Sequence, residues 1–236
     1  LPIYKKLYQK KEFNKSKIPL ITEDYINSKL SFGFQKSPTQ KFVKNFISEY
    51  TPYNGLLLWH DVGVGKTCAG IGIAENFRDS VYMNGQKILI LTPSDTLQQN
   101  WKDEIVNIEK EIDRHQNKSN KNVQCTGTKY INQLFNISNQ NKTKAKRDAK
   151  KLIEKYYEFY GYQKLVRKID RELKQRIGGR VISSKILIDY IKSRFSNRVI
   201  IMDEVHVTRD SGTAKDKLAQ PYIELIARYE IGRAHV

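Results

Sequence analysis

The feature that most constrains the fold is an octapeptide that directly follows an apolar run. Residues 60–67 read His-Asp-Val-Gly-Val-Gly-Lys-Thr and come after Leu56–Trp59. A strand that ends in a glycine-containing turn and then opens a helix points backbone N–H groups inward, and the helix adds its positive end. Lys66 can then reach the β- and γ-phosphates of a nucleotide, and the Thr67 hydroxyl can hold Mg²⁺. The octapeptide therefore predicts a strand, a phosphate-binding loop and a helix in succession.

A second apolar run ends in two carboxylates. Val199–Met202 has the pattern of a buried strand, and Asp-Glu-Val-His follows it at 203–206. At such a position Asp203 suits a metal ion, and Glu204 suits the orientation and activation of a water. The plain alternatives are a solvated strand end here and a glycine-rich turn with a surface lysine in the first motif. Both alternatives are disfavoured, because each motif lies in the strand and helix context that its chemistry requires.

The first motif departs from the general pattern G-x-x-x-x-G-K-[ST] at one position. His60 replaces the outer glycine, whereas the inner glycines remain and form the tight part of the turn. The residues expected to bind the nucleotide are Gly63, Val64, Gly65, Lys66, Thr67 and Cys68.

The composition limits the class of protein. Apolar residues make up 39% of the 236 residues, enough for one large domain or one domain with an insertion. No segment is apolar over the length that crosses a bilayer, and the N-terminus does not resemble a signal peptide. The two cysteines, Cys68 and Cys125, lack metal-ligand spacing. They fit a reducing, intracellular compartment better than a disulfide framework.

The charge favours a polyanionic partner. Lys and Arg number 42 against 25 Asp and Glu, which makes a formal net charge of +17. Such an excess favours nucleic acid, although abundant Lys, Asn, Ile and Tyr are also typical of an AT-rich genome. Residues 136–151 are rich in Asn and Lys and are expected to form an exposed loop or a disordered insertion. The lysines of 142–151 either contact phosphates or are simply solvated.

Periodicity and capping signals divide the chain into alternating helices and strands. Ser37-Pro38-Thr39-Gln40 predicts a helix start with a capping-box glutamine, and Asp95 with Gln98 forms a second such pair. Helices are expected from 37, over 66–78, from 95 with an apolar stripe to Ile112, and near 184–195. A further helix is expected over 152–177, with an apolar stripe of Leu165, Ile169, Leu173 and Ile177. Strands are expected after Gly55, over Lys87–Leu91, at Val123–Thr126 and before Asp203. This alternation predicts an α/β fold with a mainly parallel sheet.

The order of these motifs resembles the N-terminal RecA-like half of superfamily 2 helicases of the DExH type. A helix that bears Gln40 is followed by the phosphate loop, then by Thr-Pro-Ser at 92–94 and by the motif at 203–206. More narrowly, Leu56–Thr67, Tyr156–Tyr162 and Val199–His206 are similar to helicase-type ATPases of poxviruses, asfarviruses and mimivirus-like viruses. These are related to the early-transcription-factor small subunit and nucleoside triphosphatase I.

The resemblance implies a three-layer RecA-like ATP-binding domain over 37–230. Within it, 136–180 would be a basic helical insertion, and 1–36 would be a basic N-terminal extension. ATP and Mg²⁺ are the implied cofactors, and nucleic acid is the implied partner. For a viral protein of this kind, contact with the transcription machinery and a place in the virion and host cytoplasm are also implied.

Family roles carry over position by position. Lys66 and Thr67 would bind the phosphates and Mg²⁺. Asp203 would hold Mg²⁺, and Glu204 would activate the attacking water. His206 would couple the γ-phosphate site to the nucleic-acid face.

Other positions have two explanations. Gln40 resembles the glutamine that reads adenine, and its capping-box role explains it equally well. A simple strand-to-helix turn is likewise the alternative for the residues that resemble motifs touching the nucleic-acid backbone. These residues are Thr92, Pro93, Ser94, Thr126 and Gly127.

Helicase catalysis also needs a second RecA-like domain that supplies arginine fingers. None follows residues 203–206 here, and 231–236 has the character of a non-native tail. We therefore expect a piece of a longer ATPase, nearly inactive by itself. The rival classes are another P-loop enzyme and a non-catalytic, basic nucleic-acid-binding module. The base-reading motif of a GTPase and the lid of a nucleotide kinase are not evident, and the intact Lys66, Thr67, Asp203 and Glu204 disfavour the module.

Overall fold

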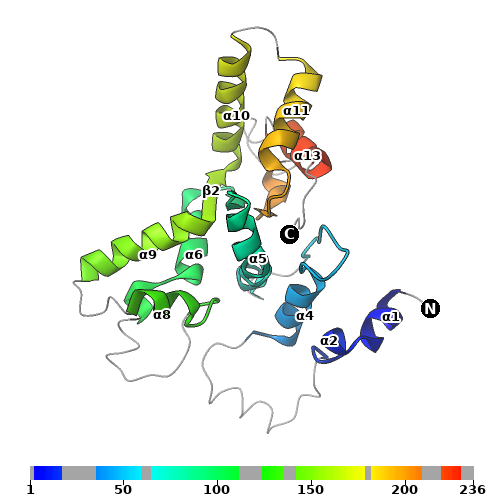
Figure 1. Ribbon diagram of the computed structural model, residues 1–236, viewed down its shortest axis with the longest axis vertical. Helices are drawn as coiled ribbons and strands as arrows, with labels where there is room; N and C mark the ends of the chain where they lie inside the picture. The colour runs from blue at the N-terminus through cyan, green and yellow to red at the C-terminus, as the bar shows by residue number, and fades with distance from the viewer. Residues whose placement is uncertain are drawn as a thin grey trace. The chain divides into compact units, whose positions relative to one another are not determined.

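The computed structural model describes residues 3–17, 36–59, 65–111, 124–135, 142–178, 182–208 and 219–229 (Figure 1). Its helices are α1 (Ile3–Gln9), α2 (Lys11–Asn14), α4 (Pro38–Phe46), α5 (Lys66–Met83), α6 (Asp95–Ile105), α8 (Lys129–Phe135), α9 (Lys142–Tyr156), α10 (Tyr162–Ile177), α11 (Ser184–Phe195) and α13 (Gln220–Tyr229). The strands are β1 (Ile88–Thr92), β2 (Tyr157–Gly161) and β3 (Ile200–Met202), and a short 3₁₀ helix, η1, spans Val205–Thr208.

The chain divides into two compact units. The first comprises residues 1–52, 58–77 and 100–155, and the second comprises 53–57, 78–99 and 156–236. Helices α5 and α6 contribute residues to both units. All three strands belong to the second unit.

A small parallel sheet organises the second unit. Its strand order is β2-β1-β3, and all five residues of the central strand β1 are buried. Ile88 lies opposite Tyr157, and Leu89 lies opposite Ile200, so both pairings are parallel. The RecA-like α/β fold class is confirmed. Because the strands are parallel, their carboxyl ends lie at one edge, where the chain continues from Thr92, Gly161 and Met202.

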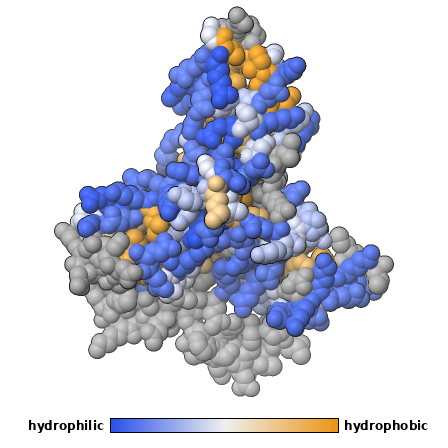
Figure 2. All heavy atoms as spheres, in the orientation of Figure 1, coloured by the Kyte–Doolittle hydropathy of each residue, from blue (hydrophilic) through white to orange (hydrophobic). Residues whose placement is uncertain are grey.

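Apolar faces of three helices complete the core of this unit. The predicted stripe of α10 is confirmed, with Leu165, Ile169 and Leu173 buried in one cluster with residues of β1, β3, α11 and α13. Gly178 ends α10 in a left-handed conformation with φ of 60°, and Ser183 caps the predicted helix α11. Hydrophilic residues cover most of the coloured surface in Figure 2, and apolar side chains gather at its upper end.

The first unit is built around α4 and the start of α5. The predicted capping box is confirmed: Ser37 Oγ accepts the Gln40 N–H at 3.1 Å, and Gln40 Oε1 accepts the Ser37 N–H at 2.9 Å. Asn76 of α5 donates from Nδ2 to the Lys44 and Ile47 carbonyls at 2.6 and 3.1 Å. These bonds satisfy the carboxyl end of α4 and fix it against α5.

Two expectations for residues 136–177 are wrong. Residues 142–151 are not an exposed loop but the first part of α9, because Ala149 and Ile153 form a buried stripe between the lysines. The helix expected over 152–177 is interrupted by β2, in which aromatic residues that favour strands pair with β1. Residues 136–141 lie outside the described residues.

Four further expectations are corrected in the described part of the chain. Leu56–Trp59 does not join the sheet, and Leu57 and Trp59 are 72% and 88% exposed, so these side chains do not form the buried faces of a strand in a parallel sheet. Gln124–Thr128 is a turn rather than a strand, and α6 ends at Ile105. The cap of α6 is Ser94 and not Asp95, since Ser94 Oγ accepts the Leu97 N–H at 3.2 Å.

No helix in the described ranges is long and apolar enough to cross a membrane.

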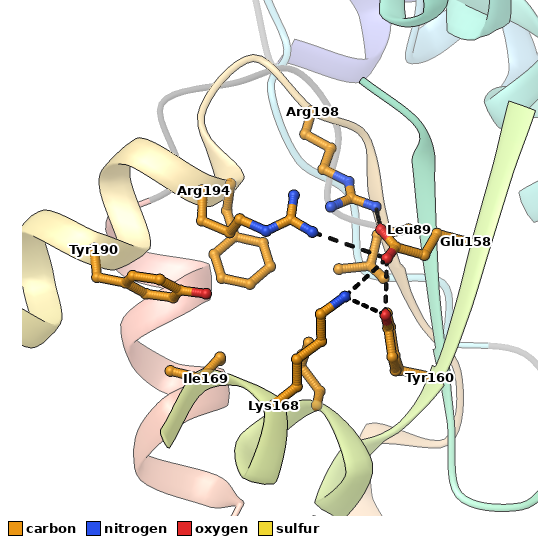
Figure 3. Close-up of a pocket in the computed structure, with 10 residues that line it drawn as sticks. Leu89, Glu158, Tyr160, Lys168, Ile169, Tyr190, Arg194 and Arg198 are labelled. Carbon is orange, nitrogen blue, oxygen red and sulfur yellow. Dashed lines mark hydrogen bonds and ion pairs between the residues drawn. The ribbon is translucent and has the colours of Figure 1, made fainter. Parts of the chain in front are cut away.

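A buried ion pair links the three strands at their amino-terminal ends. Arg198, just before β3, is 2% exposed, donates from Nε to the Lys87 carbonyl at 2.6 Å and pairs with Glu158 of β2. Tyr160 OH and Lys168 Nζ also reach this carboxylate, at 2.8 and 3.3 Å (Figure 3). Burial alone would raise the pKa of Glu158, but Arg198, Tyr160 and Lys168 outweigh burial and lower this pKa to about 2.

We expect Arg198→Met to lower the free energy of unfolding by about 3 kcal/mol, because it leaves the partly buried Glu158 carboxylate without its main, fully buried partner. Arg194→Met is the matched control. Arg194 Nη2 lies 3.8 Å from the same carboxylate, and its side chain is 30% exposed, so its loss should cost less than about 1 kcal/mol. Urea unfolding at neutral pH measures both values. Equal losses in the two variants would contradict this role of Arg198.

Candidate nucleotide site

The described part of the phosphate loop is its junction with α5. Gly63 and Val64 lie outside the described residues, as does His60. Gly65 has φ of +83°, and a Cβ there would lie 2.4 Å from Gln40 Nε2, so only glycine fits. Lys66 and Thr67 follow as the first residues of the 18-residue helix α5. The junction thus places a lysine, a hydroxyl and a helix N-terminus together, the groups that bind phosphate.

Gln40 anchors this junction. It is 6% exposed. Its Nε2 donates to the Gly65 carbonyl at 3.1 Å, while its Oε1 serves the capping box of α4. The capping explanation is confirmed. Both polar atoms of the Gln40 side-chain amide form hydrogen bonds with backbone groups. The expected contact with adenine stays a prediction.

Cys68 and Cys125 are joined in a disulfide, with their Cα atoms 5.2 Å apart. The expectation of two separate thiols is therefore wrong, because 57 residues of sequence separation conceal their proximity. The disulfide connects the first turn of α5 to the 124–128 turn. Glu104 Oε2 lies 3.1 Å from Cys125 Sγ, and the donor atoms of the three residues lie within 4.8 Å of one another. Bonded to each other, the sulfurs are not thiolate ligands.

The hydroxyls expected at the nucleic-acid backbone have partners within the fold. Thr92 Oγ1 donates to the Ser94 carbonyl at 3.0 Å, and Thr126 Oγ1 donates to the Ile105 carbonyl at 2.6 Å. Gly127 has φ of 62°, and Pro93 and Ser94 are exposed between β1 and α6. The first hydrogen bond lies in the turn between β1 and α6, and the second fixes the 124–128 turn. Both bonds have a structural explanation, so nucleic-acid contacts at these residues stay a prediction.

The acidic motif begins where β3 ends in the second unit. The Asp203 N–H donates to the Leu91 carbonyl at 2.8 Å, which continues the pairing of β3 with β1 by one residue. Glu204 has φ of 52°, a left-handed conformation that is uncommon for residues with a Cβ. His206 Nδ1 lies 3.2 Å from Glu204 Oε2. The chain therefore changes direction at Glu204, directly after Asp203.

Tyr162 is a functional candidate that sequence reasoning did not assign a role. It is 3% exposed at the start of α10, and its hydroxyl donates to the Asp203 carbonyl at 2.8 Å. Burial raises the pKa of this hydroxyl first, and the charges of Asp203 and Glu204 raise it further. The hydroxyl thus stays protonated as a donor. The sequence feature that could have drawn attention to Tyr162 is the aromatic segment 156–162, in which it is the last residue.

Comparison with known proteins identifies the family. Residues 34–227 match the family described as "Type III restriction enzyme, res subunit". Two relatives from Acanthamoeba polyphaga mimivirus carry the provisional names ATP-dependent RNA helicase L377 and R563. They are 28% and 29% identical over 87% and 88% of this chain. A third, provisionally named helicase 087L of Invertebrate iridescent virus 3, is 32% identical over 72% of it.

The chain spans 19%, 30% and 15% of the lengths of these three relatives. No solved structure matches it. The match over 34–227 agrees with the parallel sheet, with the motif at the start of α5 and with the acidic motif after β3. The chain therefore belongs to the family of the Type III restriction enzyme res subunit, and its fold and motifs match those of the N-terminal RecA-like half of superfamily 2 helicases.

Proposed function

We propose that the chain is the ATP-binding half of a nucleic-acid-dependent ATPase of the DExH type, which couples ATP hydrolysis to translocation on, or remodelling of, DNA or RNA. The observation that carries this proposal is the Gly65–Thr67 junction at the start of α5, in a chain of a helicase family. Because the relatives are viral helicase-type proteins, we also propose a role in viral transcription and a place in the virion and host cytoplasm.

The phosphate-binding half of the site would use the start of α5. Lys66 would contact the β- and γ-phosphates, and the Thr67 hydroxyl would bind Mg²⁺, which prefers oxygen ligands. Gly63, Val64 and Gly65 would direct backbone N–H groups to the phosphates. Because the Cys68 sulfur is bonded to Cys125, Cys68 would contribute its backbone N–H rather than its side chain. Gln40 would hold the Gly65 carbonyl away from the phosphates.

The hydrolytic half would use the acidic motif. Asp203 would bind Mg²⁺ as a second oxygen ligand, and Glu204 would orient and activate the attacking water. The contact between His206 Nδ1 and Glu204 Oε2 would make the position of this carboxylate sensitive to what binds near His206. This contact supports the proposed coupling of hydrolysis to nucleic acid.

The nucleotide part is tested by titrating the chain with a fluorescent ATP analogue, with Mg²⁺ and with EDTA. Saturable binding that ATP displaces and that weakens in EDTA is expected. Hydrolysis by this chain is expected to be very slow, because arginine fingers of a second RecA-like domain supply much of the rate. A chain that binds no nucleotide at millimolar concentration would contradict the proposal.

Nucleic acid would bind mainly through its phosphates, independently of base sequence. The net charge is +17, and α9 adds an exposed row of lysines, including Lys144, Lys150 and Lys151. Each neutralised phosphate should add about −0.9 to the slope of log K against log salt on duplex DNA, or about −0.7 on single strands. Filter binding in increasing salt, on two unrelated sequences, measures this slope.

Replacing these three lysines by glutamine separates the role of α9 from that of the whole chain. A shallower slope in the variant would assign phosphate contacts to α9, whereas an unchanged slope would mean that its lysines are only solvated. Affinity that does not vary with salt, or that differs strongly between the two sequences, would rule out phosphate-dominated binding by the chain.

A further inference from the structure

The backbone of Asp203 is held by two elements of the second unit. The Asp203 N–H donates to Leu91 of β1, and the Asp203 carbonyl accepts from Tyr162 at the start of α10, both at 2.8 Å. Both polar backbone groups of Asp203 therefore have partners that lie far away in the sequence. Such double anchoring leaves this residue little freedom to rotate.

The anchored carbonyl is directly connected to the conformation of Glu204. It belongs to the same planar peptide unit as the Glu204 N–H, so a bond that fixes this carbonyl also fixes one side of the Glu204 φ rotation. That φ is 52°, a left-handed value that is sterically unfavourable for a residue with a Cβ. Strained conformations of this kind persist only where surrounding contacts hold them.

The Tyr162 hydroxyl is well suited to this task. The Tyr162 ring is packed in the buried cluster with Leu91, Leu165 and Ile200, so the position of the hydroxyl is set by the core rather than by a mobile side chain. Gly161, which ends β2, lies opposite Thr92 in the register of the sheet. The donor is therefore placed at the same sheet edge as the acidic motif.

We propose that Tyr162 is a positioning residue for ATP hydrolysis, whose hydroxyl orients the Asp203–Glu204 peptide and thereby aims the Glu204 carboxylate at the attacking water. This inference rests on the proposed role of Glu204. Tyr162 does not touch the nucleotide in this proposal. Its loss should therefore slow the hydrolytic step without weakening nucleotide binding.

Tyr162→Phe in this chain is the test, because it removes only the hydroxyl and keeps the ring. We expect the single-turnover rate of ATP hydrolysis to fall about tenfold or more, the Kd for Mg-ATP to change less than about twofold, and amide exchange at 203–208 to accelerate. Tyr160→Phe is the matched control. Tyr160 lies two residues before Tyr162, and its hydroxyl donates to Glu158 rather than to Asp203. Its removal should therefore leave amide exchange at 203–208 and the hydrolysis rate unchanged.

Three results would overturn the proposal. One is an unchanged hydrolysis rate in Tyr162→Phe, and another is an equal slowing by Tyr160→Phe, which would indicate a general loss of stability. The third is unchanged amide exchange at 203–208. This last measurement needs no nucleotide, so it still decides whether Tyr162 holds the turn if the chain proves unable to bind ATP and the proposed function itself fails.

Discussion

Lys66→Ala is expected to abolish nucleotide binding by the chain, whereas Glu204→Gln should preserve binding and stop hydrolysis. The lysine would contact the phosphates in the ground state, so its loss should raise the Kd for Mg-ATP at least about a hundredfold. The glutamate would act only on the water, so its amide should lower the single-turnover rate at least about a hundredfold. Equilibrium titration and single-turnover hydrolysis separate the two effects.

Two substitutions on the described surface serve as controls for this pair. Lys102→Ala removes a lysine from α6, and Glu224→Gln changes an exposed carboxylate on α13. Neither should change the Kd or the rate appreciably. Normal hydrolysis by Glu204→Gln would show that another group activates the water, and unchanged binding by Lys66→Ala would remove Lys66 from the phosphate site.

Reduction of the Cys68–Cys125 disulfide is expected to lower the free energy of unfolding by about 4 kcal/mol. The bond closes a loop with a sequence separation of 57 residues, and restricting a loop of this length in the unfolded chain accounts for an effect of that size. Urea unfolding with and without dithiothreitol measures the difference. The chain has only two cysteines, so counting free thiols reports the oxidation state directly.

Cys125→Ser is the control for this experiment, because it removes the bond and leaves Cys68 in place. Its stability should be close to that of the reduced wild type and should not respond to dithiothreitol. Two free thiols in the denatured chain before any reductant is added would contradict the disulfide. An equal response of the variant and the wild type to dithiothreitol would instead show that the reductant acts elsewhere.

Local patterns predicted much of this molecule correctly. The capping box at Ser37 and Gln40, the helix that begins at Lys66, and the stripe of α10 all depend on residues within a few positions of one another. Such patterns report hydrogen bonds and apolar faces inside one element, so they can be recognised without knowing its neighbours. The parallel fold class followed from the order in which these elements alternate.

The same local reasoning failed where a segment suited two structures. The lysines of 142–151 suggested a solvated loop. These residues instead form part of α9, in which Ala149 is buried and the lysines lie on the exposed side. Tyr157–Gly161 could extend the neighbouring helices by composition, yet it pairs with β1 along its whole length. In both cases the burial of a few apolar side chains against other parts of the fold outweighs local preference.

By itself, the sequence determined which side chains are candidates for binding phosphate, metal and water, and it placed them next to strand and helix ends. Only the tertiary structure decided what holds them there. The Gln40 bond to Gly65, the Cys68–Cys125 disulfide and the Tyr162 bond to Asp203 join residues 25, 57 and 41 positions apart. Contacts of this range depend on how the chain folds back on itself, and no short pattern of residue types records that path.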